Sequence, residues 1–393
     1  MNFEDFFGQD TSSGKRLAIL SGGFPENGVA VPLFSRSVFK SAMRELVTYK
    51  GRTPLRKLTI RTVGILGGVL GGAPFKKKFH LADKEDSFFA FLKSKLGEDV
   101  TCSIYVGSRK FILPTFREKD GKLLGVAKAY FPGRESAYGE NEAHILDELS
   151  EMRLAGFSFP QVLAKDYFRG ALVVILSSFP NLKNARSITE RHTDFLKQLS
   201  GKTGARTAFA ESAFRKQIEG ETTFLKSEFP GDFRHVEHFR KDAVRNLEGK
   251  EFFFSLTKRE FPFFELFTSR ADSTRTDVVI DWEHARHGFP PIFDVFSLLM
   301  SSARFKKGDY TALYEKNVMD LFFGKNKKAR GFLRKMMNFW NIAPEDGYHF
   351  FVLYLIDQLY LHRHVGHRAS AERITSLFER FGADGAPQKL WKI

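Results

Sequence analysis

The sequence has a single cysteine among its 393 residues. One thiol excludes an intrachain disulfide framework and any zinc site made of several cysteines, and it is typical of a reducing compartment. No run of apolar residues approaches the roughly 18 that a membrane-spanning helix needs. The N-terminal stretch MNFEDFFGQDTSSG is acidic and lacks the basic segment and apolar core of a secretory signal. We therefore expect a cytoplasmic protein, with at most a peripheral position at the inner face of a membrane.

The sequence also lacks a Walker-type phosphate loop. Glycines recur in GILGGVLGG at residues 64–72, but no Lys-Ser or Lys-Thr pair follows at the required spacing. The basic residues 76–78, flanked by Phe75 and Phe79, come next. Basic and aromatic side chains together suit the surface of an anionic membrane. Two interpretations of this run stay open: a solvated loop, which we favour, and a peripheral membrane contact.

Positive charge and phenylalanine are both in excess. The net charge of +15 favours anionic partners such as nucleotides, phosphorylated sugars or acidic glycans. Nucleic acid is not favoured, because no RNP, KH or helix-turn-helix pattern accompanies the charge. The 44 phenylalanines are expected mainly to fill hydrophobic cores, since aromatic rings bury large areas. A chain of this length should form two lobes or domains.

Residues 101–180 are predicted to form strands around one helix. The stretches TCSIYVG, KFILPTF and KLLGVAKAYF alternate apolar residues, and Asp120-Gly121 marks a hairpin turn between the second and the third. An amphipathic helix, NEAHILDELSEM, and two further strands follow. Residues 181–393 are predicted to be mainly helical, with a β-hairpin that ends in DVVID. Residues 1–100 carry little regular pattern and are treated as an N-terminal extension.

The most informative segment is VVIDWEHARHGFPPIFDVFSLL at residues 278–299. Its β-branched start predicts a buried strand that delivers Asp281 at its carboxyl end, and such a carboxylate is a good ligand for Mg²⁺. Glu283 is a candidate second ligand, because alternate residues after a strand can face the same side. Asp294 opens an apolar helix after a turn, and we expect it to brace neighbouring loops through backbone N–H groups.

This segment carries a family resemblance. IDWE, followed by Gly288, Pro290, Asp294 and an apolar helix, resembles the metal-binding segment of the aminoglycoside-phosphotransferase-like branch of the protein-kinase-like superfamily. The resemblance implies an α+β, bilobal kinase-like fold, with a small antiparallel-sheet N-lobe at residues 101–180 and a mainly helical C-lobe at residues 181–393. It also implies ATP and Mg²⁺ as cofactors and phosphoryl transfer to a small-molecule hydroxyl.

The acceptor that the resemblance implies is a sugar. Relatives with a comparable N-terminal extension and DWE signature look like the kinase-like proteins associated with bacterial cell-surface polysaccharide loci. The implied acceptor is therefore a hydroxyl of a sugar or cell-surface glycan precursor. This assignment rests on analogy between related folds and sites.

Several residues between 100 and 180 match the nucleotide site of such a fold. Lys128 in GVAKAY and Glu142 in the following helix resemble the pair in which a lysine contacts the α/β-phosphates and a glutamate holds that lysine. Gly107 occupies the turn that would lay backbone N–H groups over phosphates. ATP is expected in the cleft below Lys128 and near Leu176 to Ser178.

Two cations follow Gly107 in the same turn, and their role stays open. Arg109 and Lys110 are either further phosphate contacts or ordinary hairpin charges. The spacing of the sequence does not choose between these interpretations.

The catalytic loop departs from the family pattern. The family carries a His-Gly-Asp-type motif, whose Asp orients the acceptor hydroxyl, and a following Asn that binds metal. With room left for the β-hairpin, Lys258-Arg259-Glu260 aligns with that motif and Phe264 stands at the Asn. Glu260 is then the candidate catalytic base, one methylene longer than aspartate. Two functions stay open: an unusual phosphotransferase, and a catalytically inactive pseudokinase that acts as a nucleotide-binding or scaffolding module.

Overall fold

The computed structural model describes residues 3–8, 15–20, 28–33, 35–50, 78–81, 83–179, 182–271, 274–304, 311–324, 326–383 and 391. The glycine repeat at residues 64–72 and most of the basic run at residues 76–78 lie outside the described residues. The chain divides into two compact units. Unit 1 comprises Met1–Asn184 and Phe267–Glu283, and unit 2 comprises Ala185–Leu266 and His284–Ile393.

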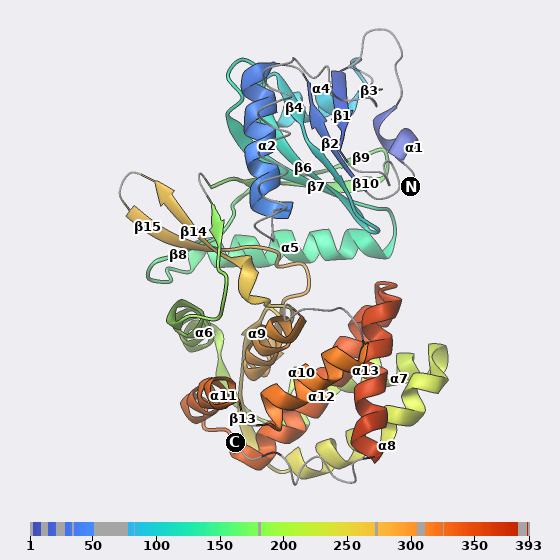
Figure 1. Cartoon of the computed structure of the whole chain (residues 1–393), viewed down its shortest axis with the longest axis vertical. Helices are drawn as coiled ribbons and strands as arrows, with labels where there is room; N and C mark the ends of the chain where they lie inside the picture. Colours follow the sequence, from blue (N-terminus) through green and yellow to red (C-terminus); the bar gives the residue numbers. More distant parts are fainter. Residues whose placement is uncertain are drawn as a thin grey trace. The chain divides into compact units, whose positions relative to one another are not determined.

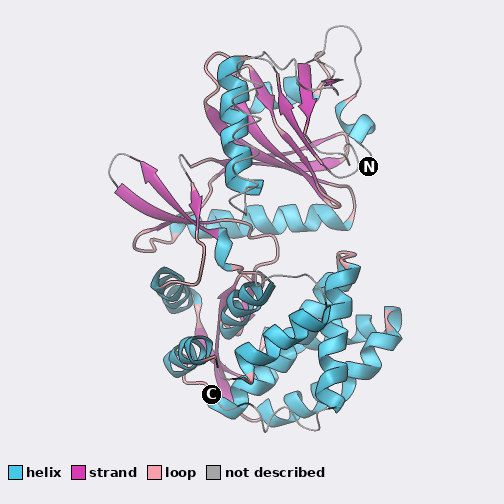
Figure 2. Cartoon of the chain, viewed as in Figure 1, coloured by secondary structure: helices cyan, strands magenta, loops and turns pink. Residues whose placement is uncertain are grey.

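An antiparallel sheet forms the body of unit 1 (Figures 1 and 2). Its strand order is β3-β1-β2-β5-β6-β7-β10-β9, and β4 pairs with β6. The strands are β1 Lys15–Ile19, β2 Val29–Pro32, β3 Lys78–Leu81, β4 Val100–Cys102, β5 Ile104–Val106, β6 Lys110–Arg117, β7 Leu123–Tyr130, β9 Val162–Phe168 and β10 Ala171–Ser177. The helices of unit 1 are α1 Phe3–Phe7, α2 Arg36–Lys50, α4 Phe88–Leu96 and α5 Arg134–Glu151. Three strands from the first hundred residues therefore extend the same sheet.

The hairpin predicted at Asp120-Gly121 is confirmed, because β6 and β7 pair in antiparallel register on either side of it. Gly121 has φ +73°, a left-handed conformation that glycine adopts without steric cost. Asp120 accepts a hydrogen bond at Oδ1 from the backbone N–H of Lys122 at 3.0 Å. The turn chemistry thus sets the register that places the residues of β7.

Alternation along β7 directs its side chains to two different faces of the sheet. Ala127 and Ala129 pack into the core that also contains α1 and α4. Lys128 and Tyr130 point to the opposite face, where α5 lies against them. A Cβ on Gly139 of α5 would come 2.5 Å from the Tyr130 ring, so this glycine permits the close approach of the helix.

Phenylalanine fills the core of unit 1, as the composition predicted. Phe6 of α1 is fully buried and contacts rings of three other elements, with centroid distances of 4.9 Å to Phe88, 5.2 Å to Phe111 and 5.3 Å to Phe168. The tilted and edge-on arrangements are those that aromatic quadrupoles favour. The first helix is thereby tied to three separate elements of unit 1.

A second, small sheet in unit 1 delivers Asp281. Its strand order is β11-β14-β15-β8, with β11 Lys183–Asn184, β14 Leu266–Ala271, β15 Thr274–Val279 and β8 Phe157–Ser158. Strands β14 and β15 are the hairpin expected before the IDWE segment. Val278 and Val279 are buried at the end of β15, three and two positions before Asp281. The buried strand therefore determines where this carboxylate emerges.

Unit 2 is mainly helical, which confirms the expected α+β fold class (Figure 2). Its helices are α6 Glu190–Thr203, α7 Ala213–Glu228, α8 Pro230–Leu247, α9 Ile292–Arg304, α10 Thr311–Phe322, α11 Lys327–Phe339, α12 Pro344–His364 and α13 Arg368–Ala383. A sheet of β12 Ala205–Ala208, β13 Glu251–Thr257 and β16 Arg286–Phe289 accompanies them. Helix α12 is buried along most of its length and contacts α7, α8, α9, α11 and α13. Among the described residues, every helix is too short or too polar to span a membrane.

Candidate functional site

Lys128 and Glu142 form a buried ion pair in unit 1. Nζ of Lys128 on β7 lies 2.6 Å from Oε1 of Glu142 on α5. The lysine is 7% exposed and the glutamate 0%. Desolvation makes such charges costly unless they are paired, so the ion pair fixes the position of the ammonium group. The two residues that the sequence resemblance pairs are therefore in direct contact.

Asp281 lies beside this pair. Its Oδ1 accepts a hydrogen bond from Nζ of Lys128 at 2.9 Å. Asp281 has φ +70°, a left-handed conformation that is uncommon for non-glycine residues and that clusters at active sites. Its side chain is 39% exposed, whereas that of Lys128 is 9% exposed. The aspartate therefore presents oxygen to solvent while the lysine is covered.

Glu283 makes a separate set of contacts in unit 1. Its Oε1 accepts a hydrogen bond from Arg109 at 3.1 Å, and its Oε2 accepts one from the hydroxyl of Tyr130 at 3.0 Å. Lys110 also donates to Oε2. The glutamate side chain is 4% exposed. Both of its oxygens are thus engaged by donors from the turn after β5 and from β6 and β7.

Tyr130 links the two glutamates, a role that the sequence analysis missed. Its hydroxyl lies 2.7 Å from Oε2 of Glu142 and 3.0 Å from Oε2 of Glu283. Burial, reinforced by these two carboxylates, raises the pKa of Tyr130 well above its ordinary value, so the phenol stays a donor. The signal was present, because residues two apart on a strand share a face and Tyr130 follows Lys128 at that spacing.

These side chains form one charge cluster in unit 1, whose members are Arg109, Lys110, Lys128, Tyr130, Glu142, Asp281 and Glu283. Burial alone would lower the pKa of Lys128. The neighbouring carboxylates, Asp281 foremost, outweigh burial and raise that pKa, so the ammonium stays charged. With three formal positive and three formal negative charges, the cluster is electrically balanced.

The remaining predicted nucleotide contacts also lie in unit 1. Gly107 is in the exposed turn between β5 and β6, and its N–H donates to the carbonyl of Lys110 at 3.1 Å. Leu176 is buried on β10, the strand that pairs with β7. Ser178 follows β10 and donates from its hydroxyl to the carbonyl of Leu123 at 3.3 Å. All three residues are therefore on or next to the strands around Lys128.

Asp281 fits the part of a magnesium ligand better than Glu283 does. Mg²⁺ usually takes one or two protein carboxylates and completes its shell with phosphate and water oxygens. Among the described residues, no group of three or more His, Cys, Asp or Glu side chains is arranged to hold a metal. The side chain of Asp281 is 39% exposed, whereas that of Glu283 is 4% exposed and has a cation on each of its two oxygens.

The segment predicted as the catalytic loop follows β13 in unit 2. Arg259, its central residue, has φ +66° and is 3% exposed. Its guanidinium donates to Glu221 of α7 at 2.9 Å and to Asp357 of α12. Burial opposes the charge on Arg259, but the two carboxylates outweigh it and raise the pKa. This buried arrangement anchors Lys258-Arg259-Glu260 to two helices.

Asp294 fastens the same segment, and the prediction that it braces a loop through a backbone N–H is confirmed. Its Oδ2 accepts a hydrogen bond from the N–H of Lys258 at 2.9 Å. The carboxylate is 1% exposed, and burial raises its pKa to about 7. The side chain of Lys258 is also buried, and its Nζ donates to Glu265 at 2.5 Å. The residue at the first position of the expected motif, Lys258, is therefore held in a buried ion pair with Glu265.

Glu260, the predicted base, lies near a histidine in unit 2. Its Oε2 is 3.5 Å from Nε2 of His284, and its side chain is 35% exposed. His284 is 5% exposed and was missed by the sequence analysis, although it directly follows IDWE. Phe264 lies in the short turn Phe263–Glu265 and has no oxygen in its side chain to offer a metal.

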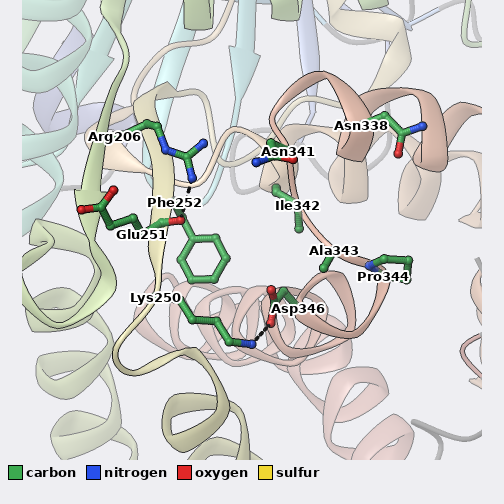
Figure 3. Close-up of a pocket in the computed structure, with 10 residues that line it drawn as sticks. All are labelled: Arg206, Lys250, Glu251, Phe252, Asn338, Asn341, Ile342, Ala343, Pro344 and Asp346. Carbon is green, nitrogen blue, oxygen red and sulfur yellow. Dashed lines mark hydrogen bonds and ion pairs between the residues drawn. The ribbon is translucent and has the colours of Figure 1, made fainter.

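A pocket of about 540 Å³ lies in unit 2 at the start of β13 (Figure 3). Arg206 donates to the carbonyl of Glu251 at 3.0 Å, and Lys250 pairs with Asp346 at 2.6 Å. The residues that line it are Arg206, Lys250, Glu251, Phe252, Asn338, Asn341, Ile342, Ala343, Pro344 and Asp346. The pocket is at the opposite end of β13 from Glu260, and none of the predicted site residues lines it.

No protein-family model matches the chain, and no curated protein matches it. Solved structures do. A thermostable mutant of aminoglycoside phosphotransferase APH(4)-Ia, in ternary complex with ADP and hygromycin B, matches with a TM-score of 0.50 and 15% identity over 76% of this chain and 99% of that chain. Another variant of that mutant, with AMP-PNP and hygromycin B, matches with a TM-score of 0.50 and 15% identity over 76% of this chain and 98% of that one.

At 15% identity these likenesses show the fold. The chain has the fold of these aminoglycoside phosphotransferases, with a sheet-based unit and a mainly helical unit. The resemblance predicted from IDWE and the residues after it is confirmed at this level.

Proposed function

We propose that this chain is a phosphotransferase that moves the γ-phosphoryl group of ATP to a hydroxyl of a small molecule. The observation that carries the proposal is the buried Lys128–Glu142 pair, with Asp281 2.9 Å from the same ammonium. Proteins of the same fold were solved with ADP or AMP-PNP. An ammonium held in place by one acid and next to a second, partly exposed acid is the arrangement that phosphoryl transfer uses.

Each residue of this group has a distinct task in the proposal. Lys128 contacts the α/β-phosphates, and Glu142 keeps its ammonium in position from the buried side. Asp281 holds Mg²⁺, which when bound supplies positive charge to the β- and γ-phosphate oxygens. The N–H groups of the turn at Gly107 donate to phosphate oxygens, and Leu176 to Ser178 border the adenine base of ATP.

The acceptor that we propose is a sugar-type hydroxyl, such as one on a cell-surface glycan precursor. The hydroxyl oxygen bonds to the γ-phosphorus as the bond between that phosphorus and the β–γ bridging oxygen breaks, which releases ADP. Glu260 accepts the hydroxyl proton. Glutamate has the basicity for this task, and its partly exposed carboxylate near His284 is the acid that the loop offers.

A second candidate function is a nucleotide-binding or scaffolding module without catalysis. The catalytic loop favours it: Lys258 is buried in an ion pair with Glu265, and Phe264 stands where the resemblance expects a metal-binding Asn. The same cluster in unit 1 would then bind nucleotide without turnover.

Calorimetry with ATP and Mg²⁺, together with ADP release over a panel of sugars, tests both candidates. If the chain is an enzyme, we expect turnover that Asp281→Ala abolishes and that Glu260→Gln reduces by about 100-fold or more, in the range of general base catalysis. Asp99→Ala removes an exposed aspartate of unit 1 and is the matched control. Binding without turnover supports the module, and turnover that Glu260→Gln leaves unchanged removes Glu260 as the base. Absence of nucleotide binding contradicts both functions.

A further inference from the structure

Lys110 provides a second lysine on the same face of the sheet as Lys128. In the β6–β7 register Lys110 lies opposite Tyr130, and Ile112 lies opposite Lys128. Residues that are directly opposite, or two apart on one strand, share a face of the sheet. Both ammonium groups reach Oδ1 of Asp281, at 2.9 Å from Lys128 and 3.5 Å from Lys110. The two lysines therefore converge on one point.

Glu283 holds the cations that follow the Gly107 turn. Arg109 donates to one carboxylate oxygen at 3.1 Å, and Lys110 donates to the other. Tyr130 adds its hydroxyl at 3.0 Å. Two cations and a hydroxyl around two oxygens form a ligand set that would suit a phosphate group equally well.

Because the charges of the cluster are balanced, the ion pairs of Glu283 with Arg109 and Lys110 compete with nucleotide phosphates for these cations. Arg109, Lys110 and Lys128 face an equal number of carboxylates, so the cluster offers a nucleotide no net positive charge. The phosphates of ATP would bring several further negative charges to the same place. Nucleotide binding is favoured if one carboxylate of the cluster releases its cations to the phosphates. Glu283 is the carboxylate that binds Arg109 and Lys110, which follow the Gly107 turn expected to lie over the phosphates.

We propose that Glu283 is an internal competitor of the nucleotide phosphates. It holds Arg109 and Lys110 in the nucleotide-free protein, and these two cations contact the phosphates when ATP binds. This inference rests on the proposed nucleotide site and gives Glu283 a role opposite in sign to that of a magnesium ligand. Removal of the charge on Glu283 should strengthen nucleotide binding, whereas removal of a metal ligand would weaken it.

Calorimetric titration of ATP into wild-type protein, Glu283→Gln and Lys110→Met tests the inference. Glu283→Gln should bind ATP on the order of tenfold more tightly, since a competing ion pair worth about 1.4 kcal/mol corresponds to that factor. The gain should appear both with Mg²⁺ and with EDTA, because it does not depend on metal. Lys110→Met should bind on the order of tenfold more weakly.

Glu140→Gln is the matched control, because it makes the same charge change on α5 at a half-exposed ion pair with Lys165. It should leave affinity unchanged. Weaker binding by Glu283→Gln, above all only with Mg²⁺, overturns the inference, as does unchanged affinity in both Glu283→Gln and Lys110→Met. Should Glu283→Gln fail to fold, Lys110→Met decides alone, and unchanged affinity in that variant overturns the inference.

ATP binding by the wild-type protein and by Lys128→Met distinguishes a wrong inference about Glu283 from a wrong proposed function. If the wild-type protein binds ATP and Lys128→Met loses that binding, the nucleotide site stands whatever Glu283→Gln does. If wild type, Glu283→Gln and Glu140→Gln all bind no ATP, the proposed site and the inference are both overturned.

Discussion

The ammonium of Lys128 lies 2.9 Å from Oδ1 of Asp281, although 153 positions separate the two residues in the sequence. Lys128 lies on β7, and Asp281 follows β15, whose last residues Val278 and Val279 are buried. The lysine is also bound from its other side by Glu142. Glu142 is therefore buried and fixes the ammonium group of Lys128, whereas Asp281 is partly exposed and accessible to a ligand.

The covered acid should matter for stability as well as for binding. Glu142→Gln removes one carboxylate partner of Lys128, and both residues of this pair are buried. Breaking a buried pair typically costs about 3–5 kcal/mol, so we expect the free energy of unfolding to fall by about 3 kcal/mol and ATP affinity to fall with it. Urea unfolding and calorimetry measure the two effects.

Glu148→Gln is the control on the same helix, because Glu148 pairs with exposed His144. We expect it to change the free energy of unfolding by less than about 1 kcal/mol. Equal losses in the two variants would show that the buried pair has no special weight.

Asp294 should make stability depend on pH in unit 2. Burial raises its pKa from the ordinary 3.8 to about 7. The folded state then holds this proton more tightly than the unfolded state, so the stabilising contribution is complete below about pH 4 and is lost as the pH rises to about 7. Asp294→Asn abolishes that dependence.

Urea unfolding of both proteins across this range measures the effect. The free energy of unfolding of wild type minus that of Asp294→Asn should fall as the pH rises from about 4 to about 7, and stay level above it. Asp147→Asn, at an exposed position on α5, serves as a control of the same charge change. A difference that grows with pH would mean that the N–H of Lys258 outweighs burial.

Local patterns were enough to predict the strand that carries Lys128, the helix that carries Glu142 and the strand before Asp281, whereas the pairing of Lys128 with Glu142 came from the family resemblance. Alternation in β7, the amphipathic helix after it and the β-branched run before Asp281 are all readable in short windows. The partners of Glu283 were not predictable in this way. Its contacts with Arg109 and Lys110 join residues 174 and 173 positions apart and depend on the β6–β7 register and on the backbone path after β15.

The first hundred residues show the same limit. Strands β1, β2 and β3 have five, four and four residues, too short to display a clear alternation. Their place in the sheet is set by pairing with one another and with β5, which no local pattern encodes. The sequence therefore indicated a poorly patterned extension where the structure continues the sheet.

Cys102 should be inert in the folded protein. It is 0% exposed on β4, and burial raises the pKa of its thiol to about 12. Since the thiolate is the reactive form, a maleimide at neutral pH should label the native protein only as unit 1 opens, whereas urea-unfolded protein should take up one equivalent at once. Mass spectrometry follows the label. Rapid labelling of the native protein would contradict the burial of β4.

The phenylalanine cluster around α1 should hold the N-terminal helix to the sheet. Phe6 is 0% exposed and contacts Phe88, Phe111 and Phe168, so Phe6→Ala removes a large ring and leaves a cavity. We expect the free energy of unfolding of unit 1 to fall by about 3–5 kcal/mol, as measured by urea unfolding. Phe339→Ala removes the same ring where it is 47% exposed and should cost less than about 1 kcal/mol. Similar losses of free energy of unfolding in both variants would mean that α1 contributes little to the core. Truncation of a buried ring removes packing that an exposed ring does not have.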